Sequence, residues 1–122
     1  MKVVINDGGR KAAGFPFTIR LCLVRATAIA TERPYQEVLT AIGEECSLRS
    51  PERLQRFMAS LGWAYTALAT PVIRKRWIAP EGRLVVVVDA HHVAVVDGVN
   101  NDVINSYAGG EMMVRGYWKI GG

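Results

Sequence analysis

The apolar run from Leu84 to Val88 constrains the fold more than any other segment of the chain. One leucine and four valines follow one another without a polar residue, and a Pro-Glu-Gly turn precedes them at residues 80–82. β-branched residues favour extended structure, and a strand that lacks polar alternation is buried on both of its faces. We therefore predict a doubly buried strand over residues 83–88.

Three segments in the first half of the chain have the apolar spacing of helices that bury one face. Capping residues and helix-ending glycines delimit them. The expected boundaries are Cys22 at the start of the first, Pro34 and Gly43 around the second, and Ser50-Pro51 and Gly62 around the third.

Further strands are expected after the doubly buried one, where β-branched residues concentrate, over residues 92–96, 101–105 and 114–120. Helices first and strands afterwards predict an α+β architecture, with the helices packed on one side of an antiparallel sheet. A chain of 122 residues is too short for two independent cores, so residues 1–122 are expected to form a single domain.

Composition excludes several classes of protein. Half of the residues are hydrophobic and 21% are charged, a balance typical of a folded core rather than a disordered chain. The longest apolar run has five residues, whereas a membrane-spanning helix needs about 20. The apolar residues Val3, Val4 and Ile5 stop at a polar turn, too early for a signal peptide. We therefore expect a cytoplasmic protein with no membrane partner.

The net charge of +4 permits contact with polyanions without indicating it. Residues 74–77 mix cations with an aromatic ring, as nucleic-acid binders do, but a solvated loop explains them equally well. A zinc site would need closely spaced pairs of ligands, and the two cysteines and two histidines of the chain lack that spacing. We expect no metal, no other cofactor and no nucleic-acid partner.

Two cysteines cannot build a disulfide framework, so Cys22 and Cys46 are expected to be free thiols. Cys22 in the first turn of a helix would lie at the positive end of the helix dipole, which favours thiolate. Cys46 lies beside Glu44 and Glu45, whose negative charges disfavour thiolate. Cys22 is therefore the candidate nucleophile, and Cys46 is interpreted as structural or incidental.

A nucleophilic thiol needs a base, and the chain offers only His91 and His92. Alternate residues of a strand share a face, and this parity alone does not choose between the two histidines. The register of the following hairpin adds information. If Val96 pairs with Asn101, then His92 faces Asn105, close enough for the amide to orient the imidazole.

A second register is open to the same hairpin. If a type I′ turn forms at residues 97–98, Val96 pairs with Val99 instead, and Asn105 becomes only a diagonal neighbour of the histidine. We favour the first register, in which Asp102 points to the other face. The predicted catalytic set is therefore Cys22, His92 and Asn105.

The order of these residues resembles that of the papain-like cysteine hydrolases, in which a Cys begins a helix and a His and then an Asn or Asp follow on adjacent strands. More narrowly, the chain resembles a group of small bacterial and phage proteins of papain-like or leader-peptidase-like type. The resemblance implies a papain-like fold in which Cys22 attacks a carbonyl, His92 transfers the proton and Asn105 orients the imidazole. The stretches that carry it are INDGGR at 5–10, CLVRATAIAT at 22–31, PY at 34–35, SLGW at 60–63, HVAVVDGV at 92–99 and GYW at 116–118.

Two positions depart from the pattern of this group. Arg20-Leu21 stand where Gly-Asp usually precedes the cysteine, and Asn105 stands where Asp is common. The favoured hypothesis is a cysteine hydrolase or peptidase that cleaves an amide or thioester bond in a peptide or protein. The alternative, motivated by Arg20 and Leu21, is a catalytically silent member of the same fold that binds a protein partner, such as a phage product acting on a host factor.

Overall fold

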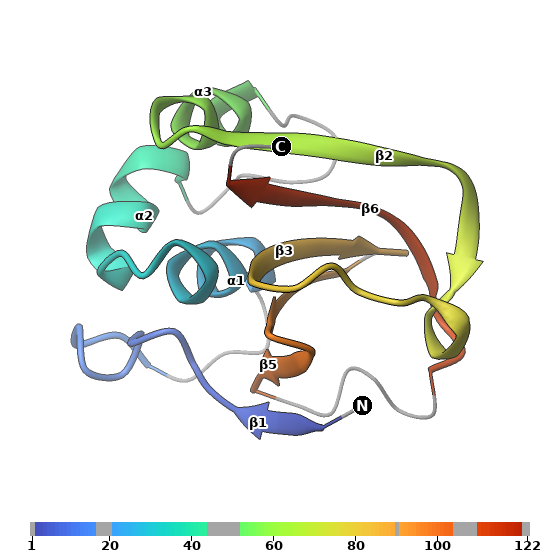
Figure 1. Ribbon diagram of the computed structural model, residues 1–122. Coiled ribbons are helices and arrows are strands. Elements are labelled where there is room, and N and C mark those ends of the chain that lie inside the picture. The colour runs from blue at the N-terminus through green and yellow to red at the C-terminus, as the bar shows by residue number, and fades with distance from the viewer. Residues whose placement is uncertain (1, 17–20, 44–51, 90, 104–109, 121–122) are drawn as a thin grey trace.

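The computed structural model describes residues 2–16, 21–43, 52–89, 91–103 and 110–120 and shows an α+β fold (Figure 1). The described strands are β1 (Val3–Ile5), β2 (Trp63–Ile73), β3 (Arg83–Val88), β4 (His91–Val96), β5 (Val99–Asp102) and β6 (Met113–Ile120). The described helices are α1 (Cys22–Thr31), α2 (Tyr35–Ile42), α3 (Glu52–Ser60) and the short 3₁₀ helix η1 (Arg74–Arg76). The strands form one sheet in the order β1-β5-β4-β3-β6-β2, so the predicted α+β class is confirmed.

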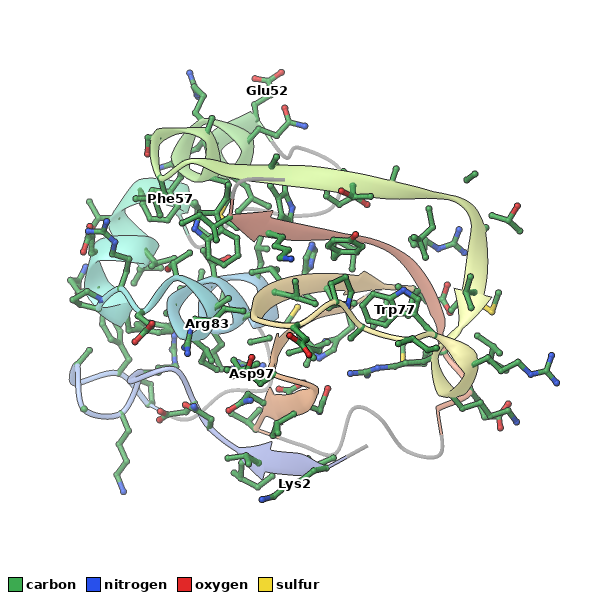
Figure 2. All side chains as sticks on the ribbon, viewed as in Figure 1. Lys2, Glu52, Phe57, Trp77, Arg83 and Asp97 are labelled. Carbon is green, nitrogen blue, oxygen red and sulfur yellow. The ribbon has the colours of Figure 1, made fainter. Side chains whose placement is uncertain are left out.

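The doubly buried strand is confirmed as β3, which lies inside the sheet. On one face, Val85 packs with the three α-helices in the larger core. On the other face, a second apolar cluster is covered by the segment after η1, where the Trp77 ring lies 5.9 Å from that of Tyr117 (Figure 2). The β3 side chains with no exposed surface are Leu84, Val85, Val86 and Val88.

The helix boundaries follow the predicted capping signals closely. α1 begins at Cys22 as expected, and α2 begins one residue after Pro34, which is its N-cap, and ends before Gly43. Ser50 and Pro51, the predicted start of the third helix, lie outside the described residues. The longest described helix has ten residues, so none of the described helices is long enough to cross a membrane.

The prediction of a purely antiparallel sheet is wrong, because β1 pairs in parallel with β5 and makes the sheet mixed. β1 has only three residues, and Ile5 is 68% exposed, so the strand carries no burial pattern that local sequence could reveal. β2 was not predicted as a strand either. It lies at the opposite edge of the sheet, and its pairing with β6 is interrupted between Ala67 and Val72.

The favoured hairpin register is also wrong. Val96 pairs with Val99 rather than with Asn101. The reason lies in the turn: Asp97 and Gly98 have φ values of 48° and 79°, the positive values that a two-residue type I′ turn requires at both central positions. β5 therefore starts two residues earlier than predicted.

Candidate active site

Cys22 lies at the N-terminus of α1, where its side chain is partly buried. The preceding residue, Leu21, has a left-handed backbone conformation and makes no side-chain capping hydrogen bond. α1 packs against β4, the strand that carries both histidines. The predicted position of the cysteine in the first turn of a helix is therefore confirmed.

The sulfur of Cys22 meets the start of β4. It is hydrogen-bonded to the side chains of His91 and His92 and to the backbone N–H of His92. Burial by itself raises the pKa of the Cys22 thiol, but these hydrogen bonds outweigh burial and bring the pKa down to about 5. The sulfur is therefore a thiolate at neutral pH.

His91 has a carboxylate partner. Its Nε2 lies 2.5 Å from Oδ2 of Asp102, and the Asp102 side chain is only 3% exposed. The hydrogen bond to Asp102 and, after it, the hydrogen bond to Cys22 raise the pKa of His91 to about 9. Between about pH 5 and pH 9, Cys22 and His91 therefore form a thiolate–imidazolium pair.

Three neighbours fix Asp102 at the end of β5. The parallel strand β1 pairs Ile5 with Asp102, and the N–H of Asn6 donates to the Asp102 carbonyl at 2.9 Å. The N–H of Val103 donates to Oδ1 of Asp102 at 2.7 Å. The main chain of Asp102 is thus held by β1, and its carboxylate accepts the N–H of the next residue.

The structure brings together two of the three residues predicted from sequence. Cys22 and His92 are in contact, and His92 is 6% exposed. Asn105 lies outside the described residues. Asp102 is absent from the predicted set because the set was built around His92, and Asp102 points to the opposite face from His92. The observed register makes Asp102 a diagonal neighbour of His91 on the adjacent strand. The Asp97-Gly98 pair, which favours this register, was the sequence signal that could have found Asp102.

Residues 74–77 do not form a wholly solvated loop. Arg74 is 1% exposed and donates to the side chain of Asn100, and Trp77 packs against Tyr117. Of these four residues, Lys75 forms an exposed ion pair, with Glu111. Within the described residues no group of three or more His, Cys, Asp or Glu could hold a metal ion, and Cys46 falls outside them.

Comparison of the chain with protein-family models, with curated proteins and with solved structures finds no match. The site combines a sulfur nucleophile that is ionised at neutral pH, an imidazole within hydrogen-bond reach of it, and a buried carboxylate behind the imidazole. A thiolate, a base and a group that orients the base are the parts that nucleophilic catalysis requires.

The ion pair gives the free energy of unfolding a characteristic pH dependence. The folded pKa of Cys22 lies below its unfolded value of about 8.5, so its stabilisation is lost as the pH falls toward 5. The folded pKa of His91 lies above its unfolded value of about 6.5, so its stabilisation is lost as the pH rises toward 9. We expect the pair to raise the free energy of unfolding by about 1.4 kcal/mol per pH unit between pH 5 and 6.5. In this range Cys22, but not His91, differs in protonation between the folded and unfolded states.

Between about pH 6.5 and 8.5 the two contributions cancel, so the ion pair should add no slope there. Urea unfolding of the wild type and of Cys22→Ser at several pH values checks this. In Cys22→Ser only the His91–Asp102 contact remains, so the stability of the variant should fall across this window while that of the wild type stays level. Parallel curves for the two proteins would show that Cys22 and His91 are not coupled.

Proposed function

We propose that the protein is a cysteine hydrolase or peptidase in which Cys22 is the nucleophile, His91 the general acid and base, and Asp102 the residue that orients His91. The observation that carries the proposal is the contact of His91 with both the Cys22 sulfur and the Asp102 carboxylate. His92 also contacts the sulfur, but the described contact with the Asp102 carboxylate is made by His91. The role of base, assigned to His92 from sequence, therefore moves to His91 in this proposal.

The reaction would proceed in two stages. The Cys22 thiolate attacks the carbonyl carbon of an amide or thioester, and imidazolium His91 gives its proton to the leaving amine or thiol as the bond to carbon breaks. Neutral His91 then takes a proton from water, whose oxygen attacks the acyl-enzyme. Release of the carboxylic acid product restores the thiolate and the imidazolium.

The N-terminus of α1 offers donors for the negative charge that develops on the carbonyl oxygen. The first backbone N–H groups of a helix have no acceptor within the helix. Leu21 provides no side-chain cap for them. The N–H of Cys22 belongs to this group and lies beside the attacking sulfur, as an oxyanion-stabilising donor must.

A papain-like relationship is part of the proposal. In support of it, the chain order is a Cys that begins a helix, a His that begins a strand, and a carboxylate on the strand that pairs with it. Three helices packed on a sheet agree with that arrangement, and the parallel edge strand β1 is the main departure from the sheet that was expected. The proposed substrate is a peptide or protein.

Alkylation by iodoacetamide tests whether Cys22 is the nucleophile. At pH 6 a thiol with a pKa near 5 is about 300-fold richer in thiolate than a free cysteine, while its lower basicity reduces intrinsic reactivity about 40-fold. We therefore expect Cys22 to react about tenfold faster than free cysteine at pH 6. Rates are measured by mass spectrometry in Cys46→Ser, which leaves one thiol, with Cys22→Ser as the matched control.

The same experiment separates the enzyme from the binding module. Fast labelling of Cys46→Ser and slow labelling of Cys22→Ser support the hydrolase. If Cys22 reacts at pH 6 no faster than free cysteine, the thiolate is missing and the catalytically silent alternative gains support.

A further inference from the structure

One buried cation joins the helix of the nucleophile to the carboxylate of the base. Arg25 lies on α1 one turn after Cys22, and its Nη2 is 3.7 Å from Oδ1 of Asp102. The side chains of Arg25 and Asp102 are each 3% exposed. The two oxygens of Asp102 are thus divided, with Oδ2 at His91 and Oδ1 at Arg25.

We propose that Arg25 is a positioning residue for the reaction, one that holds the Asp102 carboxylate so that its second oxygen stays on His91. The inference rests on the proposed function and deepens it. Because Cys22 and Arg25 belong to the same helix, the nucleophile and the orienting carboxylate are then set relative to each other through a single rigid element. The base lies between them.

The setting of Arg25 argues against a role in packing alone. It is the single charged residue among residues 23–30, which are all buried and otherwise apolar apart from Thr27. A buried ion pair is weak support for stability, since apolar side chains of similar volume often serve as well.

The direction in which the pKa of His91 changes when Arg25 is removed distinguishes a positioning role from simple charge repulsion. The described titratable and charged groups near His91 are Cys22 and Arg25 on α1, Asp102 on β5 and the adjacent His92. A positive charge that acted directly on His91 would disfavour imidazolium, so its removal would raise the pKa of His91. If Arg25 acts through Asp102, its removal loosens the Asp102–His91 contact and lowers the pKa of His91 instead.

Histidine titration by NMR tests this in the full chain, where only two imidazoles contribute. His92→Gln identifies the resonances of His91. In Arg25→Met we expect the pKa of His91 to fall from about 9 by about one pH unit or more, and in Arg25→Lys, which keeps the charge, to recover most of that loss. Arg83→Met is the matched control, because Arg83 donates to the carbonyls of Ile29 and Ala30 at the other end of α1 (Figure 2) and does not contact Asp102.

An unchanged or raised pKa of His91 in folded Arg25→Met would overturn the proposal, as would an equal fall in Arg83→Met. If Arg25→Met does not fold, Arg25→Lys is compared with Arg25→Gln, which keeps a polar head without the charge, and equal His91 pKa values in that pair would likewise overturn it. The readout is a pKa and not turnover, so the proposal for Arg25 fails independently of the proposed hydrolase activity.

Discussion

His91→Ala is expected to remove nearly all of the Cys22 thiolate at pH 6. The hydrogen bond to His91 is the largest of the influences that lower the pKa of the thiol, and burial, which raises that pKa, remains in the variant. A thiol with a pKa near 5 is about 90% ionised at pH 6, and one with the ordinary value near 8.5 is less than about 1% ionised. The ultraviolet absorbance of thiolate, measured in the Cys46→Ser background, gives this fraction directly.

His92→Ala is the matched control for that experiment. It removes a neighbouring imidazole that also contacts the sulfur but leaves the His91–Asp102 contact in place. We expect most of the thiolate at pH 6 to survive in His92→Ala. If instead His92→Ala loses the thiolate and His91→Ala keeps it, His92 is the base, as sequence reasoning proposed, and the assignment of His91 fails.

The features that the sequence predicted well are those that depend on the spacing of apolar residues within one segment. The start of α1 at Cys22 follows from apolar residues at helical spacing, and β3 follows from an unbroken run of β-branched side chains. Both features depend on a few adjacent residues, so their prediction does not require knowledge of how the rest of the chain packs. They placed Cys22 at the start of a helix and identified a strand inside the sheet.

The position of Asp102 relative to His91 depends on a single turn, and the prediction of that turn was wrong. The two registers of the hairpin differ by whether residues 97–98 alone form the loop, and Asp-Gly is a known signal for that shorter loop. The shorter loop was the second of the two registers considered, and the favoured register placed Asp102 two residues further from His91 along β4 than the observed one does. β1 could not be predicted for a different reason. It has only three residues, too few for a periodic pattern, and its partner β5 lies far away in the sequence.

The buried carboxylate should matter for stability as much as for chemistry. Asp102→Ala is expected to reduce the free energy of unfolding by about 3–5 kcal/mol, because it takes a charged partner from buried Arg25 and a hydrogen-bond acceptor from His91. Urea unfolding at pH 7 measures the loss. Glu111→Ala is the control: the Lys75–Glu111 pair is exposed, so its removal should cost no more than about 1 kcal/mol.

A double-mutant cycle shows whether that loss comes from the ion pair. In Arg25→Met/Asp102→Ala both charges are gone, so the penalty of a buried guanidinium that lacks its carboxylate is also gone. The double variant should therefore lose less stability than the sum of the two single variants, by about 1–3 kcal/mol. Strict additivity would mean that Arg25 and Asp102 do not interact in solution, and the link from the helix of Cys22 to the partner of His91 would then be absent.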